Sequence, residues 1–117
     1  KFSSTDFPMI RLAEMYLISA ECKGLQNGID RLNELRLFRG LDRLNPSNEE
    51  EFIDAILNER RLELLGEGFR WFDLVRYGKY ESTVGVEEKY TILPIPASEL
   101  SLNNNLRQHP LWQAKMP

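Results

Sequence analysis

The stretch "ILNERRLELLGEGFRWFDLVRYGK", residues 56–79, decides how this chain folds. Apolar residues recur at helical spacing on both sides of Gly66 and Gly68, which predicts two helices joined by a tight turn. Arginines and carboxylates crowd the same stretch more densely than a solvated helix face requires. Three interpretations of these charges are open: a catalytic carboxylate cluster, an anion-binding site, or a structural lattice of ion pairs.

Length and composition set the outer limits. The 117 residues are 42% hydrophobic and 28% charged, which is typical of one soluble globular domain. A net charge of −3 leaves no basic surface for nucleic acid. The single cysteine, Cys22, rules out an intrachain disulfide, and its apolar helical surroundings predict a buried, inert thiol. No run is long enough to span a membrane and no signal peptide is visible, although a start at Lys1 suggests a processed or excised piece.

Hydrophobic periodicity predicts four helices, over residues 8–24, 29–39, 49–65 and 69–77. Apolar residues cover most of the first helix, so we expect it to be buried between neighbours. Asn27 and Gly28 predict the turn into the second helix. Ser47 and Glu50 form an S-x-x-E pattern, which predicts a capping box at the start of the third.

The rest of the chain is expected to be mostly irregular. Residues 80–117 lack a sustained helical pattern, although residues 97–100 are compatible with one helical turn. Two helix–turn–helix pairs with short loops predict an all-α fold of stacked pairs, similar to tetratricopeptide repeats, with a long irregular C-terminal tail. We expect residues 1–117 to form a single domain.

The carboxylates could form a site of their own. Glu59, Glu63 and Glu67 are spaced four residues apart and share a helical stripe that could bind a hard cation. Helical di-metal sites also need a histidine three residues after each of two glutamates, and none is present. Arg60 and Arg70 instead lie within ion-pair reach along the chain, and Glu63 is expected on the more exposed side.

Other catalytic patterns are weak. His109 is the only histidine and precedes a proline in predicted coil, with no nucleophile beside it in the sequence. The Gly66-Glu67-Gly68 turn places an acid where a phosphate-binding loop needs open backbone donors. We therefore expect no catalytic residue, no metal site and no cofactor, and the protein is not expected to be an enzyme.

The structural interpretation is the strongest of the three. A tight turn places Glu67 at the corner between two helices, where guanidinium groups can reach it from either side. Beyond the turn, residues of alternating charge follow at spacings of three, and arginine pairs with carboxylates in a planar fork. Such networks fix the angle between helices more surely than they add stability. The predicted structural charge lattice consists of Arg61, Glu67, Arg70, Asp73 and Arg76.

Several motifs of the chain resemble those of a known family. "ERRLELLGEGFRWFDLVRYGK" is similar to the most characteristic motif of the SusD/RagB family, E-R-R-x-E-L-x-x-E-G-x-R-x-x-D-L-x-R. "IRLAEMYLISAEC", "RLNELRLFRGL", "YTILPIPASEL" and "NNNLRQHPLW" resemble four further elements of that family in the same order. The departures, such as Leu37-Phe38-Arg39 before Gly40 and His109 near the end, concern turn geometry. Members of the family are several times longer, so the chain resembles their C-terminal region.

The resemblance implies a function in binding and delivery. It implies a surface-exposed lipoprotein of the cell outer membrane that binds oligosaccharides, or in some members peptides, and works with a SusC-like TonB-dependent transporter. The lipid anchor would lie outside this chain, and Cys22 cannot provide it. An intracellular helical-repeat adaptor is the alternative, although the W-x-x-L-G-x-x-Y signature of such repeats is missing.

The ligand-binding residues cannot be assigned from the sequence. Most aromatic residues, such as Phe52 and Phe72, are predicted on helical core faces. Four others fall in predicted turns or coil, where they could face solvent: Tyr77, Tyr80, Tyr90 and Trp112. They are scattered along the chain, so we expect residues 1–117 alone to bind the natural ligand weakly.

Overall fold

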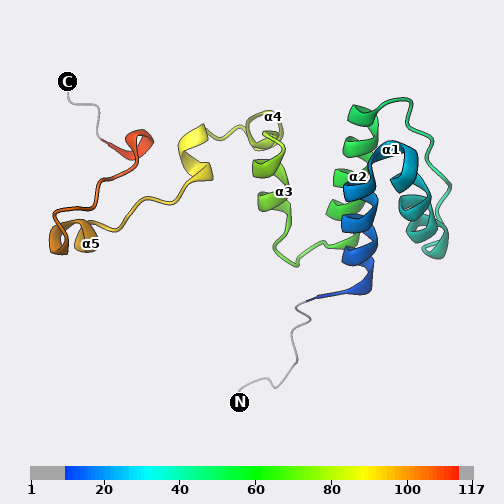
Figure 1. Cartoon of the computed structure of the whole chain (residues 1–117), viewed down its shortest axis with the longest axis horizontal. Helices are drawn as coiled ribbons and strands as arrows, with labels where there is room; N and C mark the ends of the chain where they lie inside the picture. The colour runs from blue at the N-terminus through cyan, green and yellow to red at the C-terminus, as the bar shows by residue number, and fades with distance from the viewer. Residues whose placement is uncertain (1–9, 114–117) are drawn as a thin grey trace, which may run out of the picture. The chain divides into compact units, whose positions relative to one another are not determined.

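The computed structural model describes residues 10–113, and every regular element in this range is helical. The prediction of an all-α fold is therefore confirmed. The helices, labelled in Figure 1 where space allows, are α1 (Leu12–Phe38), α2 (Glu49–Glu63), α3 (Arg70–Arg76), α4 (Tyr80–Val84), η1 (Glu88–Thr91), α5 (Ala97–Leu102) and η2 (Pro110–Trp112). The chain divides into two compact units, one up to Arg70 and one from Trp71 onward, which are described separately.

A sharp kink divides α1 into two helical segments, residues 12–23 and 25–38. Gly24 lies between them with φ 68° and ψ 178°, a conformation that residues with a side chain rarely adopt. The predicted turn at Asn27 and Gly28 is wrong, because both residues lie inside the second segment. The predicted helix start at residue 8 lies outside the described residues. Within them α1 begins at Leu12, and Arg11 at the N-cap position makes no capping hydrogen bond with its side chain.

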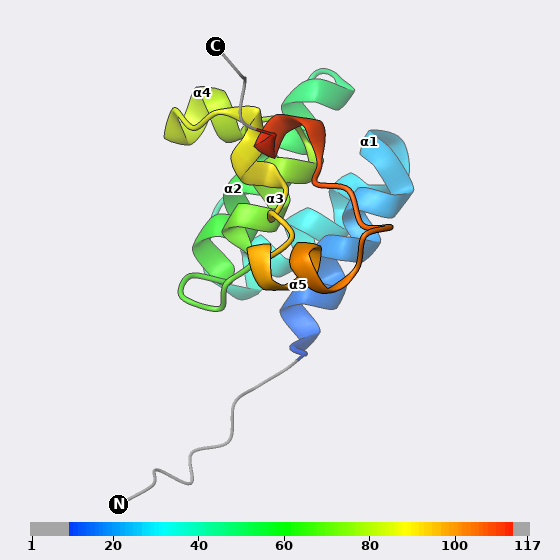
Figure 2. The same ribbon diagram turned by 90° about the vertical axis from the view of Figure 1, so that its left-hand side faces the viewer.

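At Gly28 the second segment of α1 packs closely against the first. A Cβ atom built on Gly28 would lie 2.0 Å from the carbonyl oxygen of Ala20 and 3.1 Å from Cζ of Phe52. Figure 1 shows the chain turning back between the segments, and Figure 2 shows the same helices from the side. The glycine is therefore required by close packing and not by a turn.

The core of the first unit forms where both segments of α1 meet α2. The largest side chains that are fully buried in it are Leu17, Leu32, Phe52 and Ile56. Two of them come from α2 at a spacing of four residues, which places them on one face of that helix. Burying an apolar side chain of this size contributes about 1.5–3 kcal/mol, so these residues hold the three helical segments together.

The start of α2 is capped one residue later than predicted. The Asn48 side chain accepts a hydrogen bond from the backbone N–H of Glu51 at 2.9 Å, and the Glu51 carboxylate accepts one from the N–H of Ser47. The predicted Ser47–Glu50 capping box is therefore wrong in register. Asparagine caps a helix as well as serine does, so the sequence pattern alone could not separate the two starts.

The second unit is a run of short helices fastened by side chains from the C-terminal tail. Nε1 of Trp112 donates to the carbonyl of Ile92 at 2.8 Å, and its ring meets Tyr90 edge to face. The Gln108 amide donates to the carbonyl of Ile95 and accepts from its N–H, as a neighbouring strand would. The predicted helical turn at residues 97–100 is confirmed as α5, whereas α4 was not predicted.

Three predictions of burial are wrong. The first helix is not buried between neighbours, because Leu12, Met15 and Ile18 are exposed on one side of it. Cys22 is exposed, because it lies on the side of the first α1 segment that faces away from the core. Phe72 on α3 is 69% exposed and is not a core residue. None of the helices within residues 10–113 has the length and apolar character that a membrane span needs.

Candidate functional site

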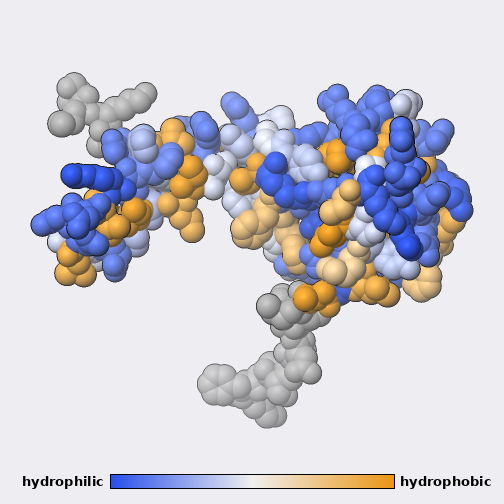
Figure 3. All heavy atoms as spheres, viewed as in Figure 1, coloured by the Kyte–Doolittle hydropathy of each residue, from blue (hydrophilic) through white to orange (hydrophobic). Residues whose placement is uncertain are grey.

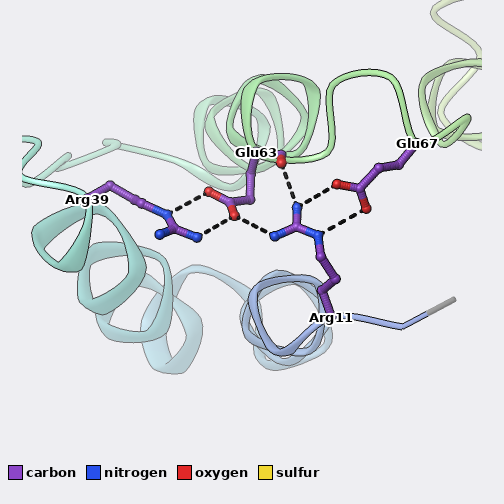
Figure 4. A network of polar contacts seen from close by, with 4 residues as sticks. All are labelled: Arg11, Arg39, Glu63 and Glu67. Atoms are coloured by element: carbon purple, nitrogen blue, oxygen red, sulfur yellow. Dashed lines mark hydrogen bonds and ion pairs between the residues drawn. The ribbon is translucent and has the colours of Figure 1, made fainter. Parts of the chain in front are cut away.

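The densest polar contacts of the first unit centre on Arg11. Its Nη1 donates to Oε1 of Glu63 at 3.0 Å, and its Nη2 donates to the backbone carbonyl of Glu63 at 2.6 Å. Its Nε lies 3.1 Å from Oε2 of Glu67, and its Nη2 lies 2.8 Å from the other carboxylate oxygen. One guanidinium therefore joins the start of α1 to the end of α2 and to the turn that follows it (Figure 4).

Arg39 approaches Glu63 from the opposite side. Its Nε donates to Oε2 at 2.9 Å and its Nη2 donates to Oε1 at 2.7 Å, which is the two-pronged geometry of an arginine–carboxylate pair. Arg39 caps the C-terminus of α1, so the Glu63 carboxylate connects both ends of the kinked helix (Figure 4). We call Arg11, Arg39, Glu63 and Glu67 the arginine–glutamate network.

The charges of this network stabilise one another. Hydrogen bonds from Arg39 and then from Arg11 lower the pKa of Glu63, and partial burial opposes them. Hydrogen bonds to Glu67 and then to Glu63 raise the pKa of Arg11, and those to Glu63 raise the pKa of Arg39. These shifts keep Arg11, Arg39 and Glu63 charged at neutral pH, whereas a general acid needs a pKa near the working pH.

The predicted stripe of three glutamates is directed at arginines from α1. Glu59 is nearly fully buried and accepts a hydrogen bond from Nη1 of Arg36, while Glu63 and Glu67 belong to the network. Glu63 was expected on the exposed side, and this is wrong, because its side chain is only 10% exposed. Among residues 10–113, no group of three or more His, Cys, Asp and Glu residues is arranged to hold a metal ion.

The structure places the five residues of the predicted lattice in different local settings. Glu67 belongs to the arginine–glutamate network. Arg61 is exposed and donates to the Asn58 side chain, and Arg70 donates to the carbonyl of Leu57 at 3.3 Å. Asp73 and Arg76 form an ion pair within α3 at 3.1 Å, and the Arg76 guanidinium lies 4.6 Å from the centre of the Tyr77 ring.

His109, the remaining candidate, has a local role. Its Nδ1 accepts a hydrogen bond from the N–H of Leu111 at 3.3 Å and so caps the short helix η2. This contact uses one of the two ring nitrogens in holding the C-terminal tail.

Sequence reasoning missed Arg11, Arg36 and Arg39 as partners of the glutamates. Helical spacing compares residues three or four apart, whereas Arg11 and Glu63 are separated by 52 positions. The signal that could have identified them is complementary charge between the two helices. Arginines recur along α1, whereas glutamates recur along the inner side of α2. The pairing itself needed the kink at Gly24.

Comparison with known proteins assigns the chain to a family. The SusD family model matches residues 1–91, which is most of the chain, so the chain belongs to the SusD family. It is 37% identical over 94 residues to a SusD-like protein from Formosa agariphila, and 33% identical over 124 residues to the starch-binding protein SusD from Bacteroides thetaiotaomicron. No solved structure matches the chain closely.

The alignments cover most of this chain but only a small part of each relative. The alignments cover 69% and 92% of this chain but only 19% and 22% of these relatives. A second SusD-like protein from Formosa agariphila, 30% identical, is covered over 24% of its length. The chain therefore spans about a fifth to a quarter of the length of the curated relatives that it matches.

Proposed function

We propose that residues 1–117 form one domain, the C-terminal part of a longer protein that binds nutrients without chemical turnover. The ligand class is an oligosaccharide, with peptides as the second candidate. The observation that carries this proposal is membership of the SusD family over residues 1–91 together with a relative named as a starch-binding protein. The length of the relatives supports the view that the chain is a piece.

The charged residues then serve the scaffold. We propose that Arg61, Glu67, Arg70, Asp73 and Arg76 act structurally and contact no ligand. This is supported by the contacts of Glu67 with Arg11, of Arg70 with the Leu57 carbonyl and of Asp73 with Arg76. A guanidinium already bound to two carboxylates has few donors left for a ligand, as with Arg11.

The partner and the location follow from the same proposal. The longer protein would be held at the surface of the outer membrane by a lipid anchor outside residues 1–117. It would pass its ligand to a SusC-like TonB-dependent transporter. The support for this step is family membership, and co-purification of such a transporter with the full-length protein is the corresponding measurement.

Calorimetry on two samples tests the proposed function. The full-length protein and residues 1–117 are each titrated with starch-derived oligosaccharides, with oligosaccharides of other linkages, and with peptides. We expect binding by the full-length protein and little by residues 1–117, because a partial site loses the preorganisation that offsets the entropy of binding. Absence of binding by the full-length protein to all of these ligands would contradict the proposal and favour the adaptor alternative.

A further inference from the structure

The kink in α1 creates a second helix start that the residue before it cannot cap. Gly24 has φ 68° and ψ 178°, outside the helical range, so the second segment starts anew at Leu25. The first N–H groups of a helical segment lack acceptors within that segment, and a side chain or solvent must supply them. The residue at the N-cap often does so with its own oxygen atom. Gly24 stands at this position and has no side chain to offer.

The missing acceptor comes from the first residue of α2. Oε2 of Glu49 accepts a hydrogen bond from the backbone N–H of Leu25 at 3.0 Å. Its Oε1 lies beside Gly24, 3.4 Å from the position that a Cβ atom would take there. Figure 1 shows α2 beginning at the end of the first unit where α1 turns back. The Glu49 carboxylate therefore stands where the side chain of an N-cap residue would otherwise be.

The local contacts at the start of α2 leave Glu49 available for this role. Asn48 caps α2 by accepting from the N–H of Glu51, and the Glu51 carboxylate accepts from the N–H of Ser47 at 2.7 Å. Glu50 makes no side-chain hydrogen bond or ion pair with the residues from 10 to 113. Of the three successive glutamates, Glu49 is thus the one that serves another helix.

Electrostatics favour a carboxylate at this point. The N-terminus of a helix carries a partial positive charge, and Glu49 lies at the start of α2 while its side chain reaches the start of the second α1 segment. Glu49 is exposed, and the end of the first unit where α1 turns back is mostly hydrophilic in Figure 3. The contact is therefore electrostatic, and burial of apolar surface contributes little to it.

We infer that Glu49 is the N-cap of the second α1 segment and stabilises the kinked form of α1. The arginine–glutamate network fastens the two ends of α1 near the end of α2, through Glu63. Glu49 fastens the kink at the start of α2. Carboxylates at both ends of α2 thus hold α1 in its folded-back conformation. This inference concerns contacts within the first unit and does not depend on the proposed function.

The cap lies one helical turn before the tight packing between the two segments. Gly28 follows Leu25 by three residues, and a Cβ atom on it would lie 2.0 Å from the carbonyl oxygen of Ala20. Helices fray from their ends, so loss of the cap releases the first turn of the second segment. The cap therefore protects the turn on which the close approach of the two segments depends.

Hydrogen exchange at the Leu25 amide tests the cap, because exchange reports local opening. The amide is followed by mass spectrometry with fragmentation in the folded full-length protein and in its Glu49→Ala and Glu50→Ala variants. We expect exchange at least threefold faster in Glu49→Ala and unchanged in Glu50→Ala, which removes the same charge from the same helical turn. An unchanged rate in Glu49→Ala, or equal acceleration in both variants, would overturn the inference.

Glu49→Gln separates the hydrogen bond from the charge. Glutamine keeps an acceptor oxygen at the same distance along the side chain, so we expect an exchange rate at Leu25 below that of Glu49→Ala. A rate as high as in Glu49→Ala would show that the acceptor makes no contribution, and would contradict the cap.

An amide inside α2 distinguishes local opening from a general loss of stability. Ile56 is fully buried and lies in the middle of α2, so its amide should exchange at the same rate in the parent protein and in every variant. Equal acceleration at Leu25 and Ile56 in Glu49→Ala would mean that the substitution destabilises the whole unit. That result would overturn the assignment of Glu49 as a cap of the second segment.

Discussion

Glu63 is absent from the predicted charge lattice, yet it connects both ends of α1 to the end of α2. Its carboxylate receives Arg39 from the end of α1 and Arg11 from its start, and its carbonyl receives Arg11 again. Charge-assisted hydrogen bonds of this kind are stronger than neutral ones, and the two arginines compensate for the solvent that the carboxylate loses. One acidic residue therefore links both ends of the kinked helix to α2.

Replacing Arg11 by alanine should destabilise the first unit. The substitution removes the hydrogen bonds to Glu63 and Glu67 and leaves a largely buried carboxylate with one partner fewer, so we expect a loss of about 1–2 kcal/mol. Chemical denaturation measures this loss. Arg31→Ala is the matched control, because Arg31 pairs with Glu34 on an exposed helix face and should contribute less than about 0.5 kcal/mol. Equal losses would show that the network adds nothing beyond a surface pair.

The lowered pKa of Glu63 predicts a dependence of stability on pH. A group whose pKa is lower in the folded state stabilises the protein above its unfolded pKa, close to the ordinary value of 4.5, and loses this contribution as the pH falls through the folded pKa. Thermal unfolding between pH 7 and pH 3 should therefore show a falling midpoint, with a shallower fall in Glu63→Gln. A parallel fall in both proteins would assign acid sensitivity to other carboxylates.

Replacing Arg70 by alanine should cost less stability than its place in the predicted lattice suggested. A buried carboxylate partner would make Arg70→Ala cost about 1–3 kcal/mol, whereas the observed contact is one hydrogen bond to the Leu57 carbonyl at 3.3 Å. We therefore expect a loss below about 1 kcal/mol by denaturation. A larger loss would indicate that the arginine contributes through a contact beyond this carbonyl.

At the scale of elements, the close packing of the two segments of α1 determines which residue position 28 can hold. Helix propensity alone would make Gly28→Ala stabilising by about 0.5–1 kcal/mol. The structure reverses the sign, because the added Cβ would lie 2.0 Å from the carbonyl oxygen of Ala20. We expect a net destabilisation of about 1–3 kcal/mol, typical of overpacking, measured by the same denaturation.

A neighbouring position supplies the control for this substitution. Asn27 lies in the same helical segment and is exposed, so Asn27→Ala should be neutral or slightly stabilising. If Gly28→Ala stabilised the protein to the same extent, the two segments would not pack as described. The comparison separates packing from propensity because both variants gain the residue that helices prefer.

At the scale of the whole molecule, the two compact units allow a test of the single-domain proposal. Both tryptophans, Trp71 and Trp112, lie in the second unit, whereas most helical residues lie in the first. Tryptophan fluorescence and far-ultraviolet circular dichroism therefore report on different units during thermal unfolding. We expect coincident transitions, because a single domain unfolds cooperatively. Separate midpoints would make each unit a domain of its own.

The sequence by itself determined the all-helical class, the family and the positions of α2 and α3. These features are local: apolar residues at helical spacing define each helix, and Gly66 and Gly68 end the one and precede the other. The family motifs are local strings as well, so the resemblance needed no knowledge of contacts. The same local signals misplaced the turn after the first helix, since Asn27-Gly28 is a turn pattern in most settings.

Only the tertiary structure decided which arginines meet which glutamates and which side of α1 is covered. The ion pairs of the arginine–glutamate network join residues 24 to 56 positions apart, and they depend on the kink at Gly24, which brings Arg11 and Arg39 to the same end of α2. A glycine inside a helix lowers its stability, so helix propensity does not explain Gly28. The close approach of the Ala20 carbonyl, which leaves no room for a Cβ atom, does explain it. Exposure of Cys22 likewise depends on which helices are present to pack against it, and periodicity along one helix contains no information about its neighbours.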